Sequence, residues 1–220
     1  MPRPVPPASI TSLAALWNAK IIGDMLARLW EGYDGLLTAG VPTWRHQDEN
    51  WLNQEIVKRI TLAIGDRRVR DPFIVMNQHM NFGGKTRKKR SPPTSDFAFH
   101  PKANMDCAFE VEAKVIEIKG RRMLGKYTAK FRSHFLKGRY SARCPAGAMI
   151  GYYSSLDPAE VFRAIGHQLA PLAPEERFSN RNHRASRHYR RVRDKGLSTT
   201  FTCHHLLLAF GQQAEQRTLL

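Results

Sequence analysis

The stretch TSDFAFHPKANMDCAFEVEAKVIEIK, residues 94–119, decides the fold because it predicts a β-hairpin that carries acidic side chains. Apolar and polar residues alternate along 109–115, which is typical of a strand with one buried face. The polar residues Glu110, Glu112 and Lys114 would share the other face of that strand. The segment therefore predicts a strand that presents an acid-x-lysine pair on one side of a sheet.

The residues before this strand predict a second acid close to the pair. Turn-forming residues fill 101–106, and a hairpin that closes near Asn104 would place Asp96 opposite Val111 and Glu112. Two carboxylates and an ammonium group would then converge on the sheet. Mg²⁺ prefers oxygen ligands of this kind, and a lysine beside them can orient or deprotonate an attacking water. In outline, this is a site for phosphodiester hydrolysis.

The acid-x-lysine pattern alone is not specific to a hydrolytic site. The chain contains a second copy, Glu117-x-Lys119, which lies on the opposite parity and closer to the strand end. The polar residues around Glu112 also fit an ordinary solvated strand face with cross-strand ion pairs. We favour Glu112-x-Lys114 because its polar neighbours share one face and because the hairpin brings Asp96 to it.

The composition predicts a basic globular protein. The 220 residues are 42% hydrophobic and 25% charged, which suits one substantial folded domain. Lysine and arginine exceed aspartate and glutamate by 35 to 19, so the formal net charge is +16. Such an excess indicates a polyanionic partner, and we expect nucleic acid.

Several protein classes are disfavoured by the sequence. No apolar run is long enough to span a membrane, and the first residues lack the pattern of a signal peptide, so we expect no membrane partner. The three cysteines, Cys107, Cys144 and Cys203, are odd in number and far apart, which argues against disulfides and for a cytoplasmic protein. A zinc site at Cys203, His204 and His205 would need a second close-spaced ligand pair, which the sequence lacks.

Periodicity and turn signals predict alternating helices and strands. We expect helices over 11–30, 47–64 and 123–136, with Gly32, Gly35, Gly40 and Pro42 as breaks after the first. A further helix should begin with Asp157 as its N-cap and end before Pro171. Strands are expected over 73–76, 95–100, 107–118, 148–153 and 199–210, and a basic loop or mobile helix over 181–195.

This order of elements, together with the acidic hairpin, resembles the PD-(D/E)XK nuclease superfamily. The resemblance covers about residues 47–210 and implies an α/β fold of the restriction-endonuclease type, with an αβββαβ core and a mixed central sheet flanked by helices. It divides the chain into an N-terminal helical extension, 1–46, and a nuclease-like domain, 47–220. Ser95 stands where the family motif has its proline.

The resemblance implies catalytic and metal-binding roles for particular residues. Asp96 and Glu112, with the backbone carbonyl after Glu112, would bind one Mg²⁺ ion or two, or alternatively Mn²⁺, and Lys114 would position water or stabilise charge. Many members have another acid on the first core helix. Glu55 is the best match and Glu49 the second choice, although Glu55 could instead pair with Arg59 one turn later.

Three basic segments would then clamp the phosphate backbone. The expected nucleic-acid contacts are Lys85, Arg87, Lys88, Lys89, Arg90, Lys126, Lys130, Arg132, Arg187, Arg190 and Arg191. A generically solvated basic surface is the alternative.

The leading functional hypothesis is a Mg²⁺-dependent DNA endonuclease of a bacterial defence or mobile-element system. Two alternatives remain open. The chain could be a catalytically idle nucleic-acid-binding subunit of a larger complex, or a structure-specific repair or recombination nuclease. A homodimer or partner subunits are compatible with each of them.

Overall fold

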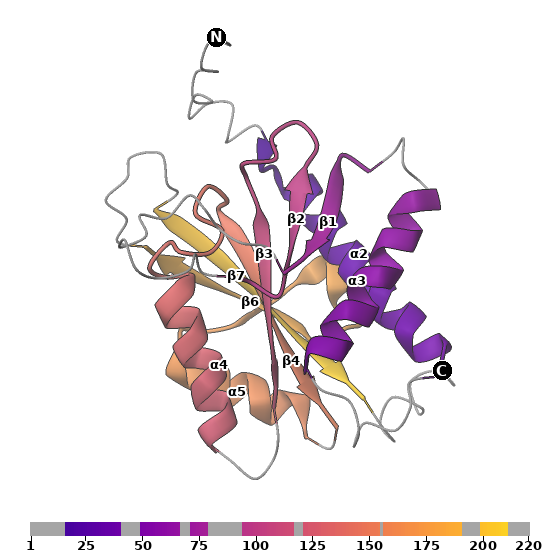
Figure 1. Cartoon of the computed structure of the whole chain (residues 1–220). Helices are drawn as coiled ribbons and strands as arrows, with labels where there is room; N and C mark the ends of the chain where they lie inside the picture. The colour runs from indigo at the N-terminus through magenta and orange to yellow at the C-terminus, as the bar shows by residue number, and fades with distance from the viewer. Residues whose placement is uncertain are drawn as a thin grey trace.

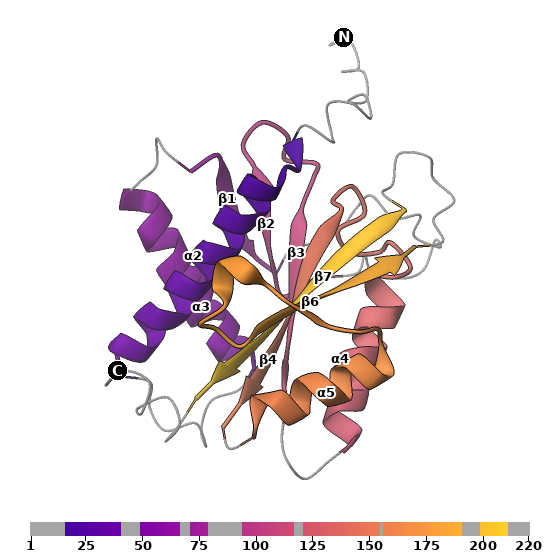
Figure 2. The same cartoon turned by 180° about the vertical axis from the view of Figure 1, so that it is seen from behind.

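A mixed β-sheet with helices on both faces forms the centre of the computed structural model (Figures 1 and 2). The structure describes residues 16–40, 49–66, 71–78, 94–116, 121–154, 156–190 and 199–210. Its strands are β1 (Phe73–Asn77), β2 (Phe97–Pro101), β3 (Phe109–Val115), β4 (Ala146–Tyr153), β5 (Ala173–Pro174), β6 (His183–Tyr189) and β7 (Thr200–Ala209). Its helices are α2 (Ala19–Thr38), α3 (Glu49–Asp66), α4 (Arg121–His134) and α5 (Pro158–Gln168), with a short 3₁₀ turn η2 (Glu176–Phe178).

The seven described strands lie in the order β1-β2-β3-β4-β7-β6-β5. The pairs β1–β2 and β2–β3 are antiparallel, β3–β4 and β4–β7 are parallel, and β6 is antiparallel to both β7 and β5. The parallel pairs lie at the centre, where all eight residues of β4 are buried, as expected for strands covered on both faces. The prediction of a mixed α/β fold with a helix-flanked sheet is confirmed.

Two hydrophobic cores lie on the two sides of the sheet. One joins α2 and α3 to inward residues of the strands, including Val111, Ala113 and Leu206. The other joins α4 and α5 to the opposite face, including Met149 and Leu207. Figure 1 shows α2 and α3 together on one side and α4 and α5 on the other. No helix of the described residues is long and apolar enough to cross a membrane.

The first helix is predicted to end at Trp30, but α2 continues through Gly32 and Gly35 to Thr38. Gly32 lies where α2 crosses α3, and a Cβ atom there would lie 2.6 Å from Ile60 Cγ1 and 3.1 Å from the Ile56 carbonyl oxygen. This glycine therefore permits close helix packing and does not end the helix.

The described part of the predicted N-terminal extension packs into the same core as the sheet. Buried residues of α2 belong to the cluster that includes Phe97 and Val111. The Arg28 guanidinium contacts both carboxylate oxygens of Asp71, each at 3.1 Å, at the entrance to β1. The Tyr33 hydroxyl donates to the Ala209 carbonyl at 2.6 Å at the end of β7. Helix α2 is thus held to both halves of the sheet.

The prediction of a basic loop or helix over 181–195 is wrong for its described part, which forms β6. His183 and Ser186 are buried, whereas Arg187 and Tyr189 are exposed. Pairing with β7 along its whole length, and not the weak local strand signal, fixes this segment as a strand. The remaining predicted elements overlap the observed ones, and Asp157 caps α5 by accepting from the Ala159 amide at 2.9 Å, as predicted.

A glycine-to-alanine substitution should have opposite effects on the free energy of unfolding in two helices, because only one of the two glycines lies at the close crossing of α2 and α3. Gly32→Ala should lower the free energy of unfolding by about 1–2 kcal/mol, because the clash outweighs the gain in helix propensity. Gly125→Ala in α4, where no described atom lies within 4 Å of an added Cβ, should raise it by up to about 1 kcal/mol. Urea unfolding followed by circular dichroism measures both. A stabilising effect of Gly32→Ala would show that the crossing is looser than described.

Candidate active site

Asp96 lies beside β3 at the position that the hairpin predicted. Phe97 pairs with Val111, so Asp96, one residue earlier, lies next to Glu112 across the antiparallel β2–β3 pair. The Ala113 amide donates to Asp96 Oδ2 at 2.7 Å. This hydrogen bond fixes the Asp96 carboxylate against β3, and the predicted juxtaposition of Asp96 and Glu112 is confirmed.

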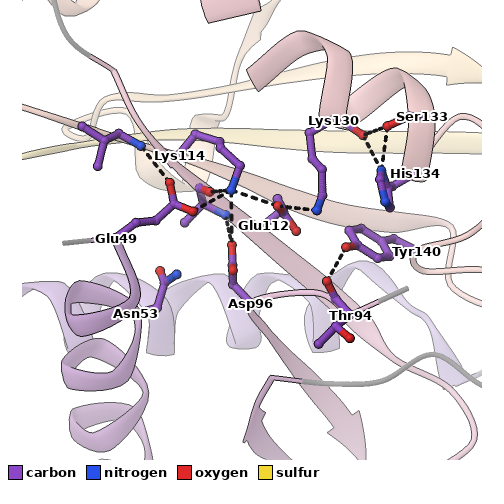
Figure 3. Close-up of polar contacts among 12 residues, drawn as sticks. Glu49, Asn53, Thr94, Asp96, Glu112, Lys114, Lys130, Ser133, His134 and Tyr140 are labelled. Carbon is purple, nitrogen blue, oxygen red and sulfur yellow. Dashed lines mark hydrogen bonds and ion pairs between the residues drawn. The ribbon is translucent and has the colours of Figure 1, made fainter. Parts of the chain in front are cut away.

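The Lys114 ammonium group lies among three carboxylates (Figure 3). Its Nζ is 2.6 Å from Glu49 Oε1, 3.0 Å from Glu112 Oε1 and 4.0 Å from Asp96 Oδ2. It also donates to the Ala113 carbonyl at 2.5 Å. Side chains from α3, β3 and the start of β2 therefore meet at one point, which we call the acidic cluster: Asp96, Glu112, Glu49 and Lys114.

The acid from helix α3 is Glu49, which reverses our preference for Glu55. Glu49 lies in the first turn of α3, where its second oxygen also accepts from the Val115 amide at 3.2 Å. Glu55 pairs within the helix with Lys58 at 3.5 Å and Arg59 at 3.7 Å. The start of α3 lies near the end of β3, so Glu49 reaches the cluster whereas Glu55 pairs on its own helix.

Glu112 is shared between two lysines. Its Oε1 lies 3.0 Å from Lys114 Nζ and 3.0 Å from Lys130 Nζ, which extends from α4. The Glu112 side chain is only 2% exposed, and its Oε2 accepts no hydrogen bond from any described residue. A buried carboxylate oxygen without a partner carries a desolvation penalty, which a cation would relieve.

Tyr140 and His134 form the wall of the site on the α4 side. The Tyr140 hydroxyl donates to the Thr94 carbonyl at 2.5 Å and lies beside Glu112. Lys130 Nζ lies 5.5 Å from the centre of the Tyr140 ring, and the His134 ring lies 4.6 Å from it. Burial and the charges of Glu112, Glu110 and Asp96 raise the pKa of Tyr140, so the hydroxyl stays protonated.

The charges of the cluster shift the pKa values of its members. Burial, followed by the charge of Glu112, raises the pKa of Asp96 to about 6. Burial would lower the pKa of Lys114, but the carboxylates of Glu112, Glu49 and Asp96 together raise it. Burial and the charge of Lys130 lower the pKa of His134 to about 4. At neutral pH, Lys114 is therefore charged and His134 is neutral.

The cluster contains oxygen atoms of the kind that a hard divalent cation prefers. Asp96 and Glu112 offer carboxylate oxygens, Ala113 of β3 offers a backbone carbonyl that accepts from Lys114, and Glu112 Oε2 has no partner among the described residues. In the described part of the chain, no group of three or more acidic, histidine or cysteine side chains is placed so that it could hold a metal ion. The Lys114 ammonium group lies between the carboxylates instead.

The predicted phosphate contacts have different positions. Lys126 and Arg187 are exposed, Lys130 contacts Glu112, and Arg132 donates to the Gln168 carbonyl. Lys85, Arg87, Lys88, Lys89, Arg90 and Arg191 lie outside the described residues, as does the second acid-x-lysine copy.

Arg190 is buried and holds the loop that carries Tyr140. Its guanidinium donates to the carbonyls of Ser141 at 3.0 Å and Cys144 at 2.8 Å, and it lies 4.4 Å from the centre of the Phe201 ring. From the other side, Glu110 accepts from the Ser141 amide, and the Ser141 hydroxyl accepts from the Glu110 amide at 3.0 Å. A phosphate on the surface cannot reach this arginine, so its role is structural and our expectation of a nucleic-acid contact there is wrong.

The sequence patterns also did not predict a network of buried histidines on β6 and β7. Trp30 Nε1 donates to His183 Nδ1 at 3.4 Å, and His183 Nε2 lies 3.2 Å from His204 Nδ1. On the other face, His205 lies between the Tyr127 hydroxyl at 2.9 Å and the Ser186 hydroxyl at 2.8 Å. Burial lowers the pKa of all three imidazoles, to about 2 for His183, about 4 for His204 and about 3 for His205. These histidines are neutral and hydrogen-bonded parts of the core.

The raised pKa of Asp96 predicts that this residue destabilises the metal-free protein. Its folded pKa of about 6 exceeds the ordinary 3.8, so the folded state binds the proton more tightly and loses stability as the pH rises from about 4 to 6. Asp96→Asn in EDTA should therefore raise the free energy of unfolding at pH 7.5 by on the order of 2 kcal/mol. The gain should shrink as the pH falls towards 4. Urea unfolding across this pH range tests it, and a variant that is less stable than wild type at pH 7.5 would contradict it.

No family model, no curated protein and no solved structure matches this chain significantly.

Proposed function

We propose that this protein is a metal-dependent nuclease that hydrolyses phosphodiester bonds, with DNA as the expected substrate. The observation that carries the proposal is the convergence of Asp96, Glu112 and Lys114 on β2 and β3. The elements α3-β1-β2-β3-α4-β4 follow one another in the order that the resemblance to PD-(D/E)XK nucleases implies. The formal net charge of +16 supports a polyanionic substrate.

The residues of the cluster have separate roles in this proposal. Asp96, Glu112 and the Ala113 carbonyl would hold Mg²⁺ or Mn²⁺, and Glu49 would complete the set of acidic ligands. The bound ion would supply Lewis-acid stabilisation of the charge that develops on the scissile phosphate. Asp96 is kept in place for this role by the Ala113 amide.

Lys114 acts as a donor and not as a base. Because the surrounding carboxylates raise its pKa, the ammonium group keeps its proton at neutral pH. It can therefore donate a hydrogen bond to a phosphate oxygen or to the attacking water, and stabilise negative charge in the transition state. Lys126 and Arg187 are exposed and available for contacts with the phosphate backbone.

One observation favours the alternative of a catalytically idle nucleic-acid-binding subunit. The acidic cluster is already bridged internally, because Lys114 contacts Glu49 and Glu112, and Lys130 contacts Glu112 as well. A site whose acids are neutralised by its own lysines could serve as a structural ion-pair network. A structure-specific repair nuclease would share the proposed chemistry and differ only in substrate.

A cleavage assay with matched helix variants tests the proposal. Wild-type protein should nick supercoiled plasmid in Mg²⁺ and not in EDTA, and Lys114→Met should lose at least about 100-fold in rate. Glu49→Gln should lower the cleavage rate about tenfold or more. Glu55→Gln is the same change six residues later on α3, and it should leave the cleavage rate at the wild-type value.

The substrate panel separates the alternatives. Cleavage of branched but not of linear duplex DNA would identify a structure-specific enzyme. Binding without cleavage of single-stranded, duplex and branched DNA or RNA would support the idle subunit. Full activity of both Asp96→Asn and Lys114→Met would show that the cluster is not the active site.

A further inference from the structure

We infer that the site holds a single divalent cation. The positive charge of Lys130 lies where a second cation would have to bind. The inference rests on the proposed metal-dependent function and concerns the number of ions and the residue that sets it. Lys130 is in this view a positioning residue of the active site, and not one of the surface contacts to the phosphate backbone.

The first argument is the position of Lys130. It lies on α4, across the site from α3, and its Nζ lies 3.0 Å from the same Glu112 oxygen that Lys114 contacts (Figure 3). Its side chain is 27% exposed, and the Tyr140 ring lies beside its ammonium group. The acidic cluster is thus closed on the α4 side by a fixed positive charge.

The second argument is the charge of the site. Asp96, Glu112 and Glu49 carry three negative charges, and Lys114 and Lys130 carry two positive ones, so these five groups sum to −1. One divalent cation changes the sum to +1, which a phosphodiester with its single negative charge then neutralises. A second divalent cation would raise the sum to +3 in a partly buried site, where like charges repel strongly.

The third argument is the supply of oxygen ligands. Two metal ions in a shared site lie about 3.5–4 Å apart and act on both sides of the scissile bond. Glu112 is the most buried acid of the cluster, and its Oε1 is occupied by the two ammonium groups. Only Oε2 is without a partner among the described residues. With Oε1 held by the two ammonium groups, a second ion would have to share Oε2 with the first.

Removal of the Lys130 charge should convert the site from one ion to two. In calorimetric titration with Mn²⁺ alone, checked by electron paramagnetic resonance, wild type should bind one ion per chain. Lys130→Met should bind the first ion about tenfold more tightly or better and gain a second Mn²⁺ site. Lys130→Arg, which keeps the charge, should behave like wild type. Lys126→Met, an exposed lysine one turn earlier on α4, should leave the Mn²⁺ stoichiometry unchanged.

The outcomes separate this inference from the proposed function. Two Mn²⁺ ions on wild type, or a Lys130→Met variant that binds Mn²⁺ like Lys126→Met, would overturn the inference and leave the metal site intact. No Mn²⁺ binding to wild type, with no cleavage, would overturn both. Circular dichroism establishes that each variant is folded, and Lys130→Gln replaces Lys130→Met in the titration if the methionine variant does not fold.

Discussion

The alternation of side chains along β3 is the constraint on which the rest of the structure depends. This strand is antiparallel to β2 and parallel to β4, so its register is fixed on both edges. Val111 and Ala113 enter the core under α2 and α3, while Glu110, Glu112 and Lys114 lie on the opposite face of the strand. A slip by one residue would bury charged groups in the first core and remove the cluster entirely.

The hairpin part of the site could be predicted from the sequence because it depends on local rules. Strand parity selected Glu112 and Lys114, and the short turn near Asn104 fixed the position of Asp96. The third acid could not be chosen in this way, because the direction in which α3 meets β3 is set by packing on α2 through contacts such as Gly32 with Ile60. The pairing of Glu55 with Arg59 was visible in the sequence, and it is what keeps Glu55 occupied on its own helix.

The basic residues show more clearly that local sequence patterns do not determine where the fold places a side chain. Lys126, Lys130 and Arg190 have the same character in the sequence, but the fold places them on the surface, against the acidic cluster and in the core, respectively. The buried position of Arg190 depends on the loop with Ser141 and on the strand β6, which local patterns did not predict. Only pairing with β7 makes that segment a strand, and only then does the arginine that follows it turn inward.

The buried histidines bear on how the proposed contact with a polyanion would depend on pH. Burial lowers the pKa of His100, His134, His183, His188, His204 and His205, which are six of the nine histidines in the chain. Five of them, with pKa values of about 4 or below, gain little charge when the medium becomes mildly acidic. In the proposed function, the attraction for phosphate would therefore come from lysine and arginine, whose charge does not change in this range. As far as these five histidines contribute, the proposed affinity for nucleic acid should respond to salt far more than to acidity.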